Sequence, residues 1–199
     1  MRTEGDGRTS ETSFEERGRE LDRTLDVCQA LWRGGPTPGT DPEVAAAVER
    51  VWCEPKPLQA GGVPLWISGR IHERTLRRIV RYGDGWIPWG EYRRDVVPGI
   101  RQVHDALDAA GRDPTRFQVR GTLPVAFHRS GAVDAERTME GVPALVEAGV
   151  TDFGLAAALP RARAELVDLL VPLVDELARV SGRPPTDPMP AANPVGRIL

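Results

Sequence analysis

Short apolar segments alternate four times with amphipathic segments after residue 62, and this alternation constrains the fold more than any other feature of the chain. In the amphipathic segments the apolar residues recur at helical spacing, whereas the apolar segments are typical of buried strands. Turn residues such as Gly83, Gly111 and Pro114 separate the segments. The expected strands are residues 63–68, 86–89, 117–127 and 151–157, and the expected helices are residues 71–82, 91–110, 134–148 and 161–180.

Strands that alternate with helices through short turns predict a parallel sheet covered by its crossover helices, and therefore an α/β fold. A closed eight-stranded barrel usually has about 250 residues, whereas this chain has 199 residues. We therefore predict a partial TIM-type (β/α) barrel of about four parallel strands. Two further helices are expected before it, at residues 14–32 and 42–51, and Asp41 is the expected N-cap of the second.

The two ends of the chain differ from its middle in composition. Residues 1–13 contain almost no apolar side chain, which predicts a disordered leader. Residues 181–199 are rich in proline and are expected to form a flexible tail. The predicted folded domain is therefore residues 14–180.

Composition also argues against several classes of partner. The net charge is −3 and 26 basic residues are spread among 29 acidic ones, so no nucleic-acid-binding surface is expected. The apolar runs are too short to span a membrane and residues 1–17 are unlike a signal peptide, which predicts a cytoplasmic protein without a membrane partner. Cys28, Cys53 and the three histidines lack the spacing of metal ligands, so neither a metal site nor a disulfide is expected.

The turn after the first expected strand is the main candidate binding site. Ser68, Gly69 and Arg70 stand between a strand and a helix, where backbone N–H groups and the helix dipole favour an anion. Arg70 can donate two hydrogen bonds to a phosphate, and Ser68 adds a hydroxyl donor. The hypothesis is a phosphorylated cofactor at this turn, and the alternative is a plain strand-to-helix turn.

Trp89 is a fourth candidate, because it ends the second expected strand and strand ends face the active-site mouth of a barrel. It is a candidate wall of a flavin or substrate pocket. His128 and Arg129 follow the third expected strand, where a catalytic loop would lie. A lone histidine there is more often a solvated loop residue than a base, so no catalytic residue is assigned.

The string Gly83-Asp84-Gly85-Trp86 is explained by structure without catalysis. Gly83 is expected to take a positive φ as a helix C-cap, and Asp84 to accept hydrogen bonds from turn N–H groups. Trp86 is expected in the core.

Four motifs occur in an order that resembles a known family. They are E-R-G-R-E-L-D-R-T-L-D-V-C-Q-A-L-W (residues 16–32), P-K-P-L-Q (55–59), P-L-W-I-S-G (64–69) and R-Y-G-D-G-W-I-P (81–88). Together they resemble the C-terminal half of the luciferase-like monooxygenases, and within that superfamily the deazaflavin (coenzyme F-420)-dependent oxidoreductases, over roughly residues 14–180.

The resemblance implies a TIM-type barrel that binds coenzyme F-420, or alternatively FMN, at the C-terminal ends of its strands. It also implies an oxidoreductase that carries out hydride transfer or monooxygenation of a small organic substrate. The turn at residues 68–70 aligns with the phosphate-binding turn of that family. The implied cofactor contacts are Ser68, Gly69, Arg70 and Trp89.

The family's first four strands have no counterpart before Phe14, and this leaves other functions open. One is a noncatalytic half-barrel remnant or assembly module, and another is a chain that lost strands through a mis-assigned gene start. A homo-oligomer, or a partner chain that supplies the missing strands, is expected because a partial barrel leaves inward faces uncovered. The faces expected to be uncovered are those of Leu65, Ile67, Ile87, Val119 and Phe153.

Overall fold

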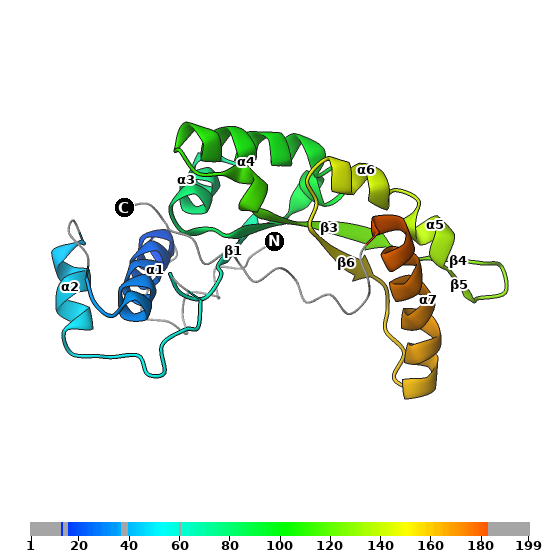
Figure 1. The fold of residues 1–199 in the computed structure, drawn as a ribbon, viewed down its shortest axis with the longest axis horizontal. Helices are drawn as coiled ribbons and strands as arrows, with labels where there is room; N and C mark the ends of the chain where they lie inside the picture. Colours follow the sequence, from blue (N-terminus) through cyan, green and yellow to red (C-terminus); the bar gives the residue numbers. More distant parts are fainter. Residues whose placement is uncertain (1–12, 14–15, 37–39, 60, 183–199) are drawn as a thin grey trace. The chain divides into compact units, whose positions relative to one another are not determined.

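The computed structural model describes residues 13, 16–36, 40–59 and 61–182 (Figure 1). The predicted leader, apart from Ser13, and all but the first two residues of the predicted tail lie outside these residues. The described part falls into two compact units, one up to Val63 and one from Pro64 onward. Within it, no helix combines the length and the apolar character that crossing a membrane requires.

The first unit contains two helices, α1 (Arg17–Arg33) and α2 (Pro42–Val48). Helix α1 ends where expected, because Gly34 adopts a φ of 91° and its N–H bonds back to the helix. Asp41 is the N-cap of α2, and its carboxylate accepts a hydrogen bond of 2.8 Å from the N–H of Glu43. A small apolar cluster joins the two helices through Ala30, Val44 and Val48.

The second unit is built on a parallel four-stranded sheet in the order β1-β2-β3-β6. Its strands are β1 (Trp66–Gly69), β2 (Gly85–Pro88), β3 (Gln118–Pro124) and β6 (Asp152–Ala156). Neighbouring strands follow each other in the sequence without a reversal of direction along the sheet, as in a barrel wall and unlike a doubly wound sheet. The predicted α/β fold with four parallel strands is therefore confirmed.

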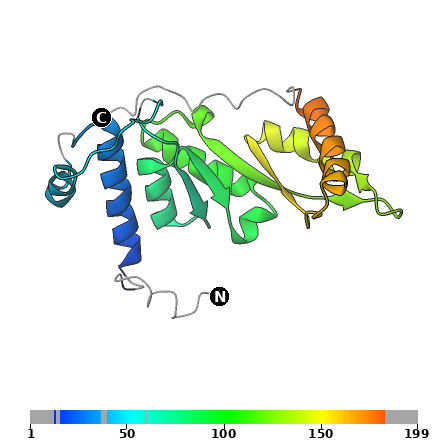
Figure 2. The ribbon, with the colours of Figure 1, turned by 90° about the horizontal axis from the view of Figure 1, so that it is seen from below.

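Helices alternate with these strands. They are α3 (Glu73–Tyr82), α4 (Val97–Ala109), α5 (Ala135–Met139), α6 (Val142–Glu147) and α7 (Arg163–Ser181). Two short 3₁₀ helices, η2 (Gly90–Arg93) and η3 (Pro114–Arg116), follow β2 and α4. Figure 1 shows α3, α4 and α6 on one side of the strands, and Figure 2 gives the same strands seen from below.

Proline explains two differences from the predicted helices. The expected helix at 134–148 is divided into α5 and α6, because Pro143 has no N–H and its ring would collide with the carbonyl of Met139 in a continuous helix. The expected helix at 91–110 likewise begins as η2, and α4 starts at Val97 immediately before Pro98.

The third expected strand is also divided. Beyond Pro124 the chain forms a separate antiparallel hairpin of β4 (Ala126–Phe127) and β5 (Val133–Asp134), which the sequence pattern did not indicate. Proline at the end of β3 has no N–H with which to continue the ladder, so the strand stops there.

The core lies on the helix side of the sheet. Ile67, Trp86 and Val119 occupy neighbouring register positions on adjacent strands and pack in one cluster with α3 and α4. A second cluster lies under α5, α6 and α7, and Phe153 packs against both clusters. The prediction that Ile67, Val119 and Phe153 lack a facing layer is therefore wrong, because these side chains are covered by the unit's own helices.

The opposite face of β3 and β6 is polar. Arg120 follows the buried Val119 and therefore points to the other side of the sheet. Its guanidinium pairs with the carboxylate of Asp152, at 2.7 Å between Nε and Oδ1, and the two residues are opposite each other in the register. The face away from the helices thus carries a charge pair at this point instead of apolar side chains.

Close packing explains the Gly83-Asp84-Gly85 string, but one expectation about it was wrong. Gly83 has a φ of −76°, so a positive φ is not the reason for glycine here. A Cβ at Gly83 would lie only 3.0 Å from the backbone of Ile79, and one at Gly85 would lie 2.6 Å from the ring of Trp66. Both glycines are therefore needed for close contact.

Trp86 lies in the core as expected, and Asp84 has a structural role, although the donor to its carboxylate that the structure shows is not a turn N–H group. The Asp84 carboxylate accepts a 2.8 Å hydrogen bond from the N–H of Leu65, immediately before β1. Trp86 has no exposed surface and lies in the larger core cluster.

Arg112 joins the ends of two helices. Gly111, with a φ of 69°, and Arg112 close α4 by donating their N–H groups to the carbonyls of Asp108 and Leu107, which is a Schellman motif. This turn directs the Arg112 side chain to the end of α3, where it donates three hydrogen bonds. They join its guanidinium to the carbonyls of Ile79 (2.8 Å), Val80 (2.6 Å) and Gly83 (2.7 Å).

Candidate functional site

The four candidate residues are brought together at the C-terminal edge of the sheet. Gly69 at the end of β1 is opposite Pro88 at the end of β2, because the strands are parallel and in register. The N–H of Trp89 donates a 3.2 Å hydrogen bond to the carbonyl of Gly69, and the indole Nε1 of Trp86 donates a 3.0 Å bond to the same oxygen. The Ser68–Arg70 turn and Trp89 are therefore fixed next to each other.

The turn presents free backbone donors. Among the residues that the structure describes, the N–H groups of Arg70, Ile71 and His72 have no acceptor. Ser68 is exposed, and its hydroxyl has no partner within the same residues. Successive outward N–H groups form a concavity that suits an anion, so the arrangement can receive a phosphate.

Helix α3 contributes less to this site than the sequence suggested. It begins at Glu73 instead of Ile71, and His72 is its N-cap. The imidazole Nδ1 of His72 accepts a 3.2 Å hydrogen bond from the N–H of Thr75, so the protein's own side chain occupies part of the helix N-terminus. The free donors therefore belong mainly to the turn that precedes the helix.

Arg70 has a partner of its own. Its Nε lies 3.5 Å from a carboxylate oxygen of Glu91 in η2, and both side chains are about two-thirds exposed, at 66% and 65%. Gly90 adopts a φ of 67°, and a Cβ there would collide with the Arg70 guanidinium. An exposed pair of this kind contributes about 0–1 kcal/mol, so a doubly charged phosphate can displace Glu91 from Arg70.

Glu91 and Gly90 were not singled out from the sequence, although the signal for them was available. They directly follow Trp89, and the ends of adjacent parallel strands lie at the same edge of a sheet. The hollow that continues from the turn along α3 was also missed as a unit. It is lined by His72, Glu73, Arg74 and Arg77, and so carries two guanidinium groups and one carboxylate.

Trp89 is exposed, with 58% of its surface accessible, whereas Trp86 is fully buried. A large aromatic side chain at a strand end, held by its backbone and open to solvent, can pack against a flat ring. That Trp89 forms the wall of a flavin or substrate pocket stays a prediction.

The histidines do not form a metal centre. Within the described part of the chain, no group of three or more histidine, cysteine, aspartate or glutamate side chains is placed to hold a metal ion. His128 lies on the β4–β5 hairpin, with Nδ1 3.4 Å from a carboxylate oxygen of Asp134. The other oxygen of Asp134 caps α5 by accepting from the N–H of Arg137 at 3.0 Å.

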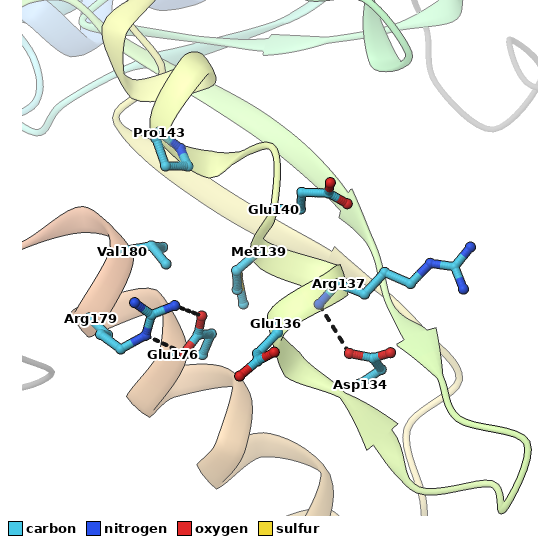
Figure 3. A pocket seen from close by; sticks show the side chains of 9 residues that line it. All are labelled: Asp134, Glu136, Arg137, Met139, Glu140, Pro143, Glu176, Arg179 and Val180. Atoms are coloured by element: carbon cyan, nitrogen blue, oxygen red, sulfur yellow. Dashed lines mark hydrogen bonds and ion pairs between the residues drawn. The ribbon is translucent and has the colours of Figure 1, made fainter.

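A second open groove lies in the helical layer, between α5, α6 and α7 (Figure 3). Arg179 donates hydrogen bonds to Glu176 on α7, and these bonds lower the pKa of the Glu176 carboxyl below its ordinary value. Figure 3 shows Arg137 extending away from this pair. The groove is formed by helices and the hairpin, so it does not share the sheet edge that carries the four candidate residues.

Comparison with known proteins agrees with this architecture. The family model described as luciferase-like monooxygenase matches residues 1–165. The crystal structure of the long-chain alkane monooxygenase LadA is similar with a TM-score of 0.62 and 14% sequence identity, over 92% of this chain and 61% of that one. At this identity the likeness shows the fold alone, and the chain spans less than two-thirds of LadA. No curated protein matches the chain.

Proposed function

The chain belongs to the luciferase-like monooxygenase family, and from this premise we propose that it is an oxidoreductase that uses a deazaflavin or flavin cofactor. The proposed reaction is hydride transfer or monooxygenation of a small organic substrate. Coenzyme F-420 is the proposed cofactor and FMN the alternative. We further propose that the chain corresponds to the C-terminal half of such an enzyme, in the deazaflavin-dependent class.

One observation carries the proposal: the sheet edge combines free backbone donors with an exposed aromatic side chain. The N–H groups of Arg70, Ile71 and His72 and the hydroxyl of Ser68 have no acceptor among the described residues. Trp89 is bound to the same turn through the carbonyl of Gly69. Both proposed cofactors join a phosphate-bearing tail to a flat ring system, so this donor set fits one end of them and the indole suits the other.

The protein's own residues would bind the cofactor and position its ring. The turn N–H groups and Ser68 would hold a phosphate, Arg70 would exchange its exposed partner Glu91 for that phosphate, and Trp89 would limit where the ring lies. When bound, the cofactor supplies the hydride or activates oxygen. Excluding water from the ring needs a second wall, which we propose comes from outside the described strands.

Cofactor titration tests the proposal. The purified chain is titrated with coenzyme F-420 and separately with FMN, and binding is followed by the change in cofactor fluorescence. Arg70→Ala is expected to weaken binding by about 10-fold, since a hydrogen bond to a charged group contributes about 1.5 kcal/mol. Arg101→Ala, an exposed arginine on α4, is the matched control and should leave affinity unchanged. Equal affinities of the two variants would contradict phosphate binding at the turn.

An assembly module is the second candidate function, and the sheet edges favour it. Among the described residues, β1 and β6 each have a neighbouring strand on one side only. Unpaired edges of this kind are able to pair with strands of another chain. Suppose that the chain alone binds neither cofactor, and that binding appears after mixing with a complementary barrel half. This result would support an assembly module over an independently active enzyme.

A further inference from the structure

Helix α7 is apolar on two faces. On one face Leu169 and Leu173 are buried at 8% and 1% exposure, within the smaller core cluster. On the other face Val167, Val171 and Val174 are exposed at 48%, 50% and 43%. Figures 1 and 2 show α7 at the margin of the second unit. A surface helix normally has one apolar face, which packs on the core, so the second apolar face of α7 requires an explanation.

Four exposed apolar residues and the half-buried Ala178 have the spacing of a coiled-coil seam. Ala164, Val167, Val171, Val174 and Ala178 follow one another at intervals of three, four, three and four residues, which is the alternation of positions a and d in a heptad. We call these five residues the valine seam. Four of them lie beyond residue 165, where the match to the family model ends.

Charges beside the seam indicate what covers it. With Ala164 at position a, Asp168 is at position e of that heptad and Arg163 is at position g of the preceding one. Both side chains are exposed, and neither has an ion-pair partner in the described ranges. In a parallel two-stranded coiled coil, a g residue faces the e residue five positions further along the other helix. Arg163 would therefore face Asp168 of a second copy, and the symmetric pair would form as well.

The antiparallel arrangement is electrostatically worse. There, e residues face e residues across the seam, and these positions are occupied by Asp168 and Asp175. Like charges that face each other across an interface disfavour it. Pro172 is at position b, beside the seam, so its ring does not occupy the contact.

We propose that the valine seam is the contact through which a second copy of this chain docks, with the two α7 helices parallel about a two-fold axis. The same patch on both copies forms such an interface, which is the commonest symmetry of homodimers. Two heptads bury less than a standard interface of about 800 Å² per partner, so the dimer is weak and concentration-dependent. The seam is separate from the sheet edge, and the inference does not rest on the proposed function.

Sedimentation equilibrium of the full chain between 1 and 200 µM tests the proposal. The expected mass rises with concentration from 21.8 kDa toward twice that value. Val171→Asp should remain monomeric throughout and keep the wild-type circular dichroism spectrum, because this side chain is not part of the core. Val51→Asp, at a valine of 51% exposure in the first unit, is the matched control and should still dimerise. A monomeric wild type, or a dimer unaffected by Val171→Asp, would overturn the proposal.

Two further variants test the orientation. Arg163→Asp should raise the dimer dissociation constant at least 10-fold, and the double variant Arg163→Asp/Asp168→Arg should restore it. In a background with Cys28→Ser and Cys53→Ser, Ala178→Cys should form a disulfide with its own counterpart on mild oxidation, since a residue near one end of α7 meets its counterpart only in a parallel pair. Failure of both the charge rescue and the Ala178→Cys cross-link would overturn the parallel seam.

Discussion

Replacing Arg112 with alanine removes the contact that ties the end of α3 to the end of α4. The guanidinium donates three hydrogen bonds of 2.6–2.8 Å to carbonyls at the C-terminus of α3, where the helix dipole also favours a positive charge. A hydrogen bond to a charged group contributes about 1.5–3 kcal/mol, but three bonds from one side chain share a single group and do not add. In the variant, water can donate hydrogen bonds to these partly buried carbonyls and so offset part of the lost free energy.

We therefore expect Arg112→Ala to lower the free energy of unfolding by about 2–4 kcal/mol, a large fraction of the roughly 5–15 kcal/mol typical of a folded protein. Urea titration followed by tryptophan fluorescence measures it, and the midpoint should fall while the m value stays constant. Arg112→Lys keeps the charge but loses the planar fork of donors, so its stability should lie between that of the wild type and that of Arg112→Ala.

Arg101→Ala is the matched control, because this exposed arginine lies on α4. Surface substitutions of this kind usually change stability by less than about 0.5 kcal/mol. If Arg112→Ala and Arg101→Ala unfold at the same urea concentration, the assigned role of Arg112 in closing α3 is refuted.

Three further changes test the account of the fold. Asp84→Ala leaves the N–H before β1 without its acceptor and should lower stability by about 1–3 kcal/mol in urea titration. Gly99→Ala places a methyl group against the buried ring of Trp86; overpacking by about 1–3 kcal/mol exceeds the gain of about 1 kcal/mol in helix propensity, so the thermal midpoint should fall. Hydrogen bonds from Arg179 lower the pKa of Glu176 below its ordinary value of 4.5. This contribution to stability is complete above pH 4.5 and is lost as the pH falls through the lowered pKa, so Glu176→Gln should flatten that part of the stability profile measured by acid titration.

Each of these outcomes has a counterpart that would contradict it. Gly141→Ala is the control for Gly99→Ala, since a Cβ at Gly141 meets nothing within 4 Å; equal midpoints for the two variants would show that Trp86 yields without cost. An unchanged midpoint for Asp84→Ala would show that water satisfies the N–H group. An acid profile of Glu176→Gln identical to that of the wild type would place the pH dependence at other carboxylates.

Alternation of apolar and amphipathic segments was enough to predict the parallel strand order, because short turns leave few ways to connect such segments. The same reasoning placed Gly69 beside Trp89, since parallel strands end at one edge. Pro143 indicated a break between α5 and α6, but the prediction of one continuous helix did not take this proline into account.

Long-range side-chain contacts could not be predicted from the alternation of apolar and amphipathic segments. Arg112 is separated by more than 30 residues from two of the carbonyls that it binds, and no local pattern marks such a contact. Gly83 was correctly expected to be structural, but its reason is the approach of Ile79 and not its own backbone angle. The prediction that Ile67, Val119 and Phe153 are uncovered was wrong, because the helices of the unit pack on the face that carries these side chains.

The placement of the core on one side of the sheet has a consequence for evolution of this unit. Both apolar clusters of the sheet lie with the helices, whereas β3 and β6 carry a charge pair on the other face. Thr122 and Gly154, paired on β3 and β6, sit next to the Arg120–Asp152 charge pair on that second face. Substitutions at these positions change the surface of the unit without removing a side chain from either core cluster.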